Sequence, residues 1–351
     1  MAGEKIVLVS LGQKFDATVI RDAYYRSITD YLRSQELSVA VEDGDEYNKE
    51  LTVDLLRDAD GVIFSSNGPM SRDVMEKLPR LKFILRYGIG LNSVDLDAAS
   101  ELGKVVCYTP GYCSEEIGIH AVAMGLAALR NITYYDRMMR RGKWLKGNGP
   151  LPRRPRNMTV GIFALGASGR VVAQAMGAGF GARVIAHDPY VDSGTARSLN
   201  VELVDFDELL RESDMIFINA PLLPETRHIF NRDAFAKMRD GVIVVNISRG
   251  GLIDTEALVD ALNSGKVAKA ALDVFEKEPL DQDAELLKHD FVTVTPHSAY
   301  YGKEALDDAD YLVSRIPARF FLDKKIYKRN LANPAVMAKF PDHKLLDIPV
   351  E

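Results

Sequence analysis

Short apolar runs rich in β-branched residues recur along most of the chain and alternate with segments of helical pattern. The runs are apolar throughout, which is typical of strands that are covered on both faces. This alternation predicts an α/β fold in which helices connect parallel strands. The expected strands are 6–9, 61–64, 82–85, 105–108, 159–163, 183–187, 215–219, 242–246, 269–273 and 291–295. The main expected helices are 21–33, 71–78, 96–101, 114–139, 171–176 and 303–322.

One irregular stretch, 140–157, separates two such series of strands and helices. It is basic and contains several glycines and prolines, which favours a loop or linker. Its cluster Arg153-Arg154-Pro155-Arg156 could hold a phosphate, but a solvated surface loop is favoured because no aromatic or glycine framework accompanies it. The second series starts at Met158, so the pattern indicates two α/β regions.

Composition narrows the class of protein. With 44 basic and 50 acidic residues the net charge is −6, which argues against general nucleic-acid binding. The longest apolar run, 121–129, is too short to cross a bilayer. The two cysteines, Cys107 and Cys113, form neither a disulfide framework nor a CxxC zinc pair. With no signal-peptide pattern at the start, we expect a cytoplasmic protein with reduced thiols.

A glycine turn follows the strand 159–163. The turn reads Ala164-Leu165-Gly166-Ala167-Ser168-Gly169 and runs into a helix, so free backbone N–H groups and the positive helix end meet at one point. That arrangement suits a pyrophosphate, with Gly166 allowing its approach and Gly169 allowing close helix packing. Ala164 stands at the first glycine of the usual G-x-G-x-x-G, and we expect it to hold the turn at negative φ.

The next strand ends at Asp188, 19 positions after Gly169. A carboxylate there accepts hydrogen bonds from ribose hydroxyls and repels a 2′-phosphate. No basic residue follows directly, since Pro189 and Tyr190 come next. Strand, turn, helix and acid together predict NAD as the cofactor in preference to NADP.

Three later strand ends carry chemical groups, namely Arg249, the acids Asp273 and Glu278, and His297. In an open α/β sheet, sites form outside the carboxyl ends of the strands. A guanidinium beside flexible glycines can clamp a carboxylate, and a histidine can exchange protons near neutral pH. Each residue taken singly is most often structural, so only their combination is informative.

The motif set resembles the D-isomer-specific 2-hydroxyacid dehydrogenases, a family that also includes the C-terminal-binding-protein corepressors. The stretches that carry the resemblance, in the family's order, are Arg86–Asp95, Thr109–Gly111, Val160–Arg170, Ser213-Asp214, Pro221–Arg227, Asn246–Gly251, Leu272–Pro279 and Thr295–His297. The resemblance implies two Rossmann-like, doubly wound domains. It implies a discontinuous substrate domain, 1–106 plus 303–351, and an inserted NAD-binding domain, 107–302.

The resemblance also implies roles for residues. Arg249 matches the arginine that binds the substrate carboxylate, His297 the general acid/base, and Glu278 the acid that orients the histidine. Asp273 matches the carboxylate that holds the nicotinamide amide. The positions implied to contact NAD are Ser114, Gly166, Ala167, Ser168, Gly169, Asp188, Pro221, Ile247 and Asp273. The positions implied to contact substrate are Tyr87, Gly88, Ile89, Arg249 and His297. No metal is implied.

The leading hypothesis is therefore an NAD-dependent oxidoreductase that interconverts a D-2-hydroxy acid and its 2-keto acid. Segment 114–157 resembles the family's dimerising arm, which implies a homodimer. A corepressor-like NAD(H)-sensing protein with little turnover is the alternative. A formate-dehydrogenase-like enzyme is a third, narrower alternative. Glu278 argues against it, because enzymes of that kind resemble sites in which glutamine replaces the acid partner of the histidine. Ile119 precedes His120 at a position where members of the family usually have an acidic residue. The sequence does not identify the side chain of the substrate.

Overall fold

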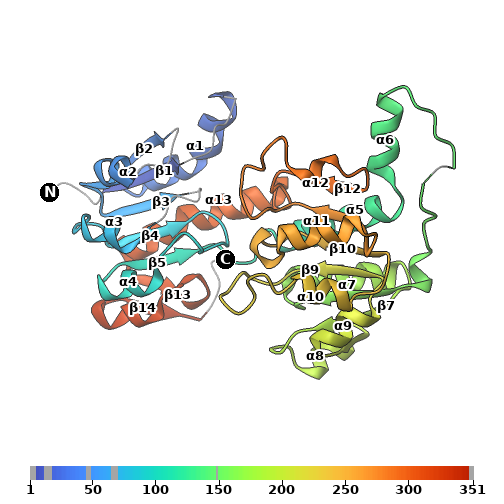
Figure 1. Cartoon of the computed structure of the whole chain (residues 1–351). Coiled ribbons are helices and arrows are strands. Elements are labelled where there is room, and N and C mark those ends of the chain that lie inside the picture. Colours follow the sequence, from blue (N-terminus) through green and yellow to red (C-terminus); the bar gives the residue numbers. More distant parts are fainter. Residues whose placement is uncertain (1–4, 12–17, 45–48, 65–69, 148, 348–351) are drawn as a thin grey trace. The chain divides into compact units, whose positions relative to one another are not determined.

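The chain divides into two compact units. The computed structural model describes residues 5–11, 18–44, 49–64, 70–147 and 149–347. One unit combines Met1–Tyr112 with Lys303–Glu351, and the other is Cys113–Gly302 (Figure 1). The expected boundary at 106/107 falls inside a strand of the first sheet, Val105–Tyr108, because that strand pairs along its whole length with Phe83–Arg86. The first crossing between units therefore lies further along the chain.

The first unit contains a parallel sheet of five strands, in the order β2-β1-β3-β4-β5, which is the order of flavodoxin-like doubly wound sheets. The strands are β1 (Lys5–Leu11), β2 (Ser38–Gly44), β3 (Gly61–Phe64), β4 (Phe83–Arg86) and β5 (Val105–Tyr108). Apolar side chains of two helices cover one face, α1 (Thr18–Ser34) and α13 (Lys303–Ala318). The other face is covered by α2 (Lys49–Leu56), α3 (Arg72–Glu76) and α4 (Leu96–Glu101).

The C-terminal segment is more ordered than the expected irregular end. α13 stops at Ala318 and continues as a π-helical turn, Arg319–Asp323, instead of running on as one helix to 322. Two short strands follow and pair in parallel, β13 (Lys325–Tyr327) and β14 (Lys344–Leu346). The side chain of Asn333 accepts a hydrogen bond from the β5 backbone and donates another to the residue before β5, which ties the segment to the first sheet.

The second unit contains a parallel sheet of seven strands, in the order β12-β11-β10-β9-β6-β7-β8. They are β6 (Thr159–Phe163), β7 (Arg183–His187), β8 (Val201–Leu203), β9 (Met215–Ile218), β10 (Val242–Asn246), β11 (Val267–Leu272) and β12 (Val292–Val294). The chain proceeds from β6 to one side and returns at β9 on the other, which is the Rossmann switch point where ligands bind. Because all seven strands are parallel, their carboxyl ends share one edge.

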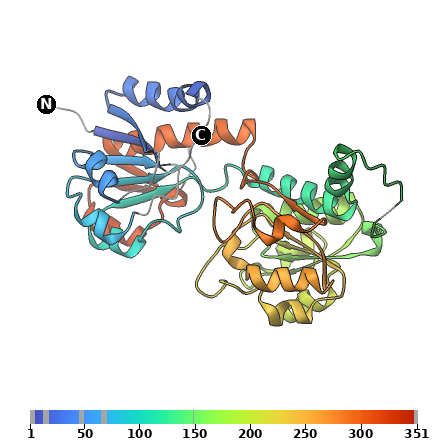
Figure 2. The same ribbon diagram turned by 45° about the horizontal axis from the view of Figure 1, so that its top comes forward.

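Helices cover both faces of this sheet, as Figure 2 shows. The helices on one face are α5 (Ser114–Leu129), α7 (Ala167–Gln174) and α8 (Ser193–Ser198). Those on the other are α9 (Phe206–Glu212), α10 (Arg232–Lys237), α11 (Thr255–Asn263) and α12 (Glu285–Lys288). Alternate residues of β7, β9 and β10 belong to the two apolar clusters, which confirms that these strands are buried on both faces. In the described ranges, no helix has the length and apolarity needed to span a membrane.

The expected single helix over 114–139 is wrong. The structure has two helices, α5 and α6 (Ile132–Arg140), separated at Asn131, whose φ is +58°. The buried ammonium of Lys269 on β11 donates to Leu129 O (3.1 Å) and to Asn131 Oδ1 (2.5 Å). Burial lowers the pKa of Lys269 to about 8. This lysine satisfies a carbonyl at the end of α5 and holds the asparagine in the conformation that breaks the helix.

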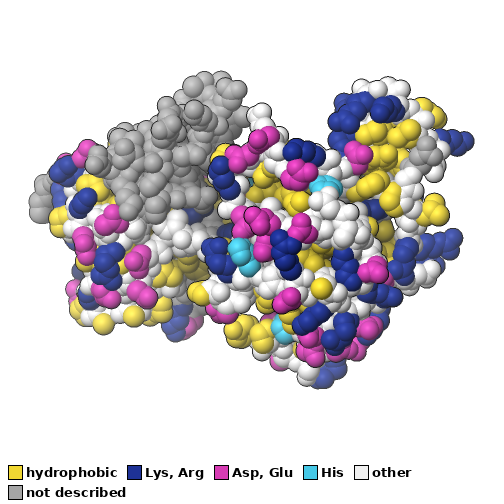
Figure 3. Space-filling view, in the orientation of Figure 1, with side chains coloured by type: hydrophobic (Ala, Val, Ile, Leu, Met, Phe, Trp, Pro, Cys, Tyr) yellow, Lys and Arg dark blue, Asp and Glu magenta, His cyan; other side chains and the backbone are white. Residues whose placement is uncertain are grey.

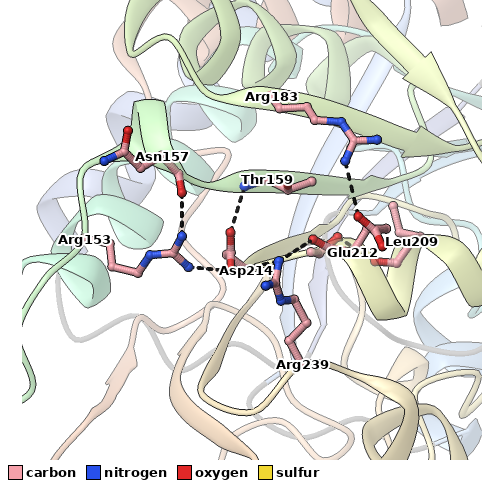
Figure 4. A network of polar contacts seen from close by, with 9 residues as sticks. Arg153, Asn157, Thr159, Arg183, Leu209, Glu212, Asp214 and Arg239 are labelled. Atoms are coloured by element: carbon pink, nitrogen blue, oxygen red, sulfur yellow. Dashed lines mark hydrogen bonds and ion pairs between the residues drawn. The ribbon is translucent and has the colours of Figure 1, made fainter.

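The basic stretch after α6 is anchored by an ion pair (Figure 4). Arg153 Nη1 lies 2.5 Å from Asp214 Oδ1, and Arg239 lies 3.5 Å from the same oxygen. Asp214 Oδ2 accepts the N–H of Thr159, the first residue of β6, at 2.9 Å. Arg153 therefore takes part in a network at the amino ends of β6 and β9, while its side chain stays 52% exposed, so the expected solvated surface loop is confirmed for this residue.

We predict that Asn131→Ala lowers the free energy of unfolding by about 2–5 kcal/mol. Alanine carries a left-handed backbone penalty of about 1–2 kcal/mol, and the loss of an acceptor for buried Lys269 adds about 1–3 kcal/mol. Asn131→Gly is the matched control, because glycine keeps the backbone conformation and loses only the side chain, which accepts from Lys269 and donates to Pro150 O. Urea unfolding followed by circular dichroism measures both. Equal stability of the two variants would show that the left-handed backbone does not set the cost.

Candidate active site

The glycine turn connects β6 to α7 at the shared edge of the second sheet. A Cβ on Gly169 would lie 2.4 Å from Ala164 O, so only glycine allows this approach of helix and strand. A Cβ on Gly166 would meet nothing within 4 Å. Gly166 and Ala167 are exposed at the start of α7. The turn therefore presents open backbone at a helix N-terminus, the feature that suits a pyrophosphate.

Ala164 does not have the negative φ that the sequence suggested; its φ is +74°. Its N–H donates to His187 O at 2.9 Å, and its carbonyl packs against Gly169. These backbone contacts fix the turn and hold an L-residue in the left-handed region, at a cost of about 1–2 kcal/mol.

Asp188 and Asn219 lie beside the turn. The Asp188 carboxylate accepts the N–H groups of Leu165 (2.8 Å) and Tyr190 (2.9 Å), so it joins the turn to the end of β7. Asn219 directly follows β9 and donates from Nδ2 to Ser168 Oγ at 3.0 Å. Its buried Oδ1 has no hydrogen-bond partner among the described residues. Asn219 is not among the residues predicted from sequence, although an amide at the end of an apolar strand is a usable signal.

Arg249 lies in the turn after β10. Buried Asn246 holds this turn, since its Nδ2 donates to Arg249 O (2.9 Å) and its Oδ1 accepts from the N–H and the hydroxyl of Ser248 (both 3.1 Å). A Cβ on Gly250 would fall 1.9 Å from the carbonyl carbon of Phe275. Only glycine fits here, and so the turn after β10 lies against the segment after β11.

Glu278 and His297 form a pair, with His297 Nδ1 at 2.7 Å from Glu278 Oε2. Glu278 Oε1 accepts the N–H of Phe275 at 2.9 Å. Burial by itself raises the pKa of Glu278, but the contacts with His297 and Phe275 and the charge of Arg249 outweigh it. The net pKa of Glu278 lies below its usual value, so the carboxylate is ionised at neutral pH.

Asp273 anchors the segment that carries His297. Its fully buried carboxylate accepts the hydroxyl of Thr295 (2.6 Å) and the N–H groups of Ser298 (2.9 Å) and Ala299 (3.0 Å). Its carbonyl accepts the N–H of His297 at 2.7 Å. His297 has φ +53°, a left-handed conformation that these bonds hold in place. The predicted contact of Asp273 with the nicotinamide stays a prediction.

The remaining NAD positions lie on the same unit. Ser114 begins α5, exposed Pro221 follows β9, and Ile247 is buried directly after β10. Their contacts with the cofactor stay predictions. Among the described residues, no cluster of three or more histidine, cysteine, aspartate or glutamate side chains has the arrangement of a metal site.

Tyr87, Gly88 and Ile89 lie in the first unit, directly after β4. The N–H of Tyr87 donates to Phe64 O (2.9 Å), and that of Gly88 donates to Thr109 Oγ1 (3.0 Å). The Arg86 guanidinium donates to the backbone carbonyls of Phe64 on β3, of Tyr87 within this loop and of Gly90 after it. Of the three amides, only that of Ile89 has no acceptor within the described part of the chain.

Comparisons with known proteins show what this chain is similar to. Residues 122–299 match the profile described as "D-isomer specific 2-hydroxyacid dehydrogenase, NAD binding domain". The chain is 39% identical over 276 residues to a D-3-phosphoglycerate dehydrogenase of Archaeoglobus fulgidus, covering 79% of this chain and 52% of that protein. It is 39% identical over 280 residues to a hydroxypyruvate reductase of Thermotoga maritima, covering 78% and 88%.

A solved structure with a similar fold is the NAD-dependent formate dehydrogenase of Staphylococcus aureus in complex with NAD. The TM-score is 0.81 at 27% identity, over 93% of this chain and 98% of that one. This chain spans about half the length of several curated D-3-phosphoglycerate dehydrogenases that it matches. Arg249, Glu278 and His297 all lie inside the matched range 122–299.

We predict that Ala164→Gly raises the free energy of unfolding by about 1 kcal/mol. Relief of about 1–2 kcal/mol of backbone strain exceeds the added unfolded-state entropy of glycine, about 0.4–1 kcal/mol. Ala167→Gly is the matched control, because this alanine is helical and its loss lowers stability. Urea unfolding measures both variants. A fall in stability with Ala164→Gly would contradict the strain assigned to this position.

Proposed function

Because this chain belongs to the D-isomer specific 2-hydroxyacid dehydrogenase family, we propose that it interconverts a D-2-hydroxy acid and its 2-keto acid with NAD as redox partner. The observation that carries the proposal is the 2.7 Å contact between His297 and Glu278, at the sheet edge that also bears the Arg249 turn and the glycine turn. A proton-exchanging imidazole, a fixed cation and a dinucleotide turn at one edge are the parts that this reaction needs.

The residues present fit NAD. Open backbone at Gly166 and Ala167 would hold the pyrophosphate, and Asp188 the adenosine ribose. The unpartnered Asn219 Oδ1 beside Ser168 is an acceptor to which a bound dinucleotide could donate. Asp188 follows β7 on one side of the turn, and the strands bearing the proposed catalytic residues lie on the other. When bound, NAD supplies the hydride acceptor of the oxidation.

His297 exchanges the proton in this proposal. Its Nδ1 is engaged by Glu278, so Nε2 is the nitrogen that takes the hydroxyl proton of the hydroxy acid or returns one to the keto acid. The ionised carboxylate of Glu278 offsets the positive charge that the imidazole acquires and fixes the orientation of the ring. The lowered pKa of Glu278 supports this role, because the acid keeps its charge while the histidine cycles.

Arg249 binds the substrate carboxylate and stabilises negative charge that develops on the reacting oxygen. The buried amide of Asn246 fixes the backbone from which this guanidinium extends. In the first unit, the loop Tyr87, Gly88 and Ile89 is proposed to contact the substrate through its backbone. The Ile89 amide is the group of the three best suited to receive a carboxylate.

We also propose that the chain forms a homodimer through the arm 114–157. Apolar side chains gather over α6 and the following loop, next to basic ones (Figure 3). The strongly exposed apolar residues of this arm are Ile119, Ile132, Met139, Trp144 and Leu151. A shallow hollow of about 300 Å³ lies among the side chains of α6 and Trp144. Exposed apolar patches of this kind are typical of subunit interfaces, and a second copy is the partner that the family resemblance implies.

The cytoplasmic location predicted from composition is part of the same proposal. Cys107 and Cys113 are both buried and unbridged, which is compatible with a reducing compartment.

The dimer predicts that Leu151→Glu yields a monomer, because it introduces a charge into the proposed apolar interface. Sedimentation at micromolar concentration measures the state. The only tryptophan, Trp144, lies on the arm, so its emission also shifts to longer wavelength on dissociation. Phe180→Glu, at an exposed apolar residue outside the arm, is the control and stays dimeric. A wild-type monomer under these conditions would contradict the proposal.

The function is tested by NADH oxidation with pyruvate, glyoxylate, hydroxypyruvate, 2-ketoisocaproate and 3-phosphohydroxypyruvate, and by NAD reduction with formate. We expect turnover of at least one keto acid and none of formate. His297→Gln lowers kcat by about 10²–10⁴-fold because the acid/base is lost, while the Kd for NADH changes little. NADH binding without turnover of any keto acid would contradict the enzyme and favour the sensing alternative.

A further inference from the structure

A second histidine, His120 on helix α5, contacts the residues that hold the His297 segment in place, Thr295 and Asp273. His120 lies in the second turn of α5, and its Nε2 is 3.1 Å from Thr295 Oγ1 and 3.6 Å from Asp273 Oδ1. Thr295 directly follows β12, and Asp273 directly follows β11, which pairs with β12 up to Leu272 and Val294. Three polar side chains from three elements thus meet at the site edge, and the proposed reaction uses none of them for proton transfer.

The directions of these hydrogen bonds follow from counting donors. The Thr295 hydroxyl has one hydrogen, and the carboxylate oxygen of Asp273 at 2.6 Å is a stronger acceptor than the Met124 sulfur at 3.4 Å. The hydroxyl therefore donates to Asp273 and accepts from His120. This requires the hydrogen on Nε2 of His120. A chain of donors runs from α5 through Thr295 to the buried carboxylate.

That carboxylate holds the backbone on which His297 depends. It accepts the N–H groups of Ser298 and Ala299, the two residues after His297. His297 itself has a left-handed φ of +53°. Such a conformation persists only when the surroundings fix it. A donor that orients Asp273 therefore acts on the position of the imidazole, and on its 2.7 Å contact with Glu278.

We propose that His120 is a positioning residue of the reaction, which acts through Thr295 and Asp273 to hold His297 in its left-handed conformation against Glu278. The proposal rests on the function assigned to His297 above. The contacts of His120 are with Thr295 and Asp273, and not with His297 or Glu278. His120 contributes by orienting Asp273 through Thr295. A misplaced His297 imidazole would lower the rate of the chemical step.

The substitutions that interrupt this series of hydrogen bonds are His120→Phe and Thr295→Val. Each keeps the approximate shape of the side chain and removes one link. We expect either variant to lower kcat by about tenfold or more, and to shift the pH profile of kcat, with the Kd for NADH within about twofold of wild type. Because both cut the same chain, the double variant loses little more than either single one. His120→Gln, which keeps an N–H donor, restores most of the rate.

A matched control lies close by on β12. Thr293 lies two residues before Thr295 and is buried, whereas Thr295 is half-buried, and the Thr293 hydroxyl bonds to Thr133 Oγ1 at 2.6 Å instead of to Asp273. Thr293→Val removes a buried hydroxyl of the same kind without touching the chain. It is expected to lower the melting temperature and to leave the pH profile of kcat unchanged.

A readout without turnover separates this inference from the proposed function. The chain has six histidines, so the ¹³Cε1 resonance of His297 can be assigned by single substitutions in the labelled protein. We expect the titration of this resonance, with and without NADH, to move in His120→Phe and Thr295→Val and to stay fixed in Thr293→Val. The charged groups around His297 are Glu278, which contacts it, and Arg249, whose charge acts on Glu278. None of these variants alters either residue.

The outcomes are distinct. If no keto acid is turned over, the proposed function fails, and the His297 resonance still tests the positioning role. If His120→Phe and Thr295→Val both leave the titration and the pH profile as in wild type, the inference is overturned, whatever their melting temperatures. Should His120→Phe not yield folded protein, Thr295→Val together with Thr295→Ser, which keeps the hydroxyl, decides the same question.

Discussion

Every strand of the two large sheets runs parallel to its neighbours, and the rest of the molecule depends on this constraint. Parallel pairing requires a crossover after each strand, so helices cover both faces and the strands are apolar on both sides. Within each sheet it also brings the carboxyl ends of the strands to one edge. The glycine turn, Arg249, Glu278 and His297 are separated by tens of residues in the chain, and they share an edge because the strands before them share a direction.

The apolar patterns were sufficient for the central strands. The bounds expected for β6, β7 and β10 are those of the structure, because each strand is a short apolar run that both faces bury. β2 and β8 were not foreseen. β8 has only three residues, and β2 includes polar positions, so neither has the pattern of a strand buried on both faces. The break at Asn131 depends on Lys269, which lies 138 residues away in sequence and is invisible to local periodicity.

The site divides in the same way. Motif spacing was enough to propose Arg249, Glu278 and His297, since each follows a recognisable strand. The contacts that hold them were not predictable, because they depend on tertiary approach. Gly250 fits against Phe275 only once two turns lie side by side, and the positive φ of Ala164 is imposed by backbone bonds to a neighbouring strand. Sequence motifs identified the chemical groups, whereas packing determines how rigidly they are held.

Lys269 and Asp273 have a joint consequence for helix α5. Lys269 on β11 and Asp273, which directly follows this strand, are four residues apart, which corresponds to about 13 Å of extended chain. Their partners on α5, Leu129 and His120, are nine residues apart, or about 13.5 Å of helix. The helix therefore runs antiparallel to the strand, with a polar contact near each end. Apolar side chains alone would let the helix shift along its axis by a residue. Two polar contacts at matching spacing allow only one register of the helix against the strand.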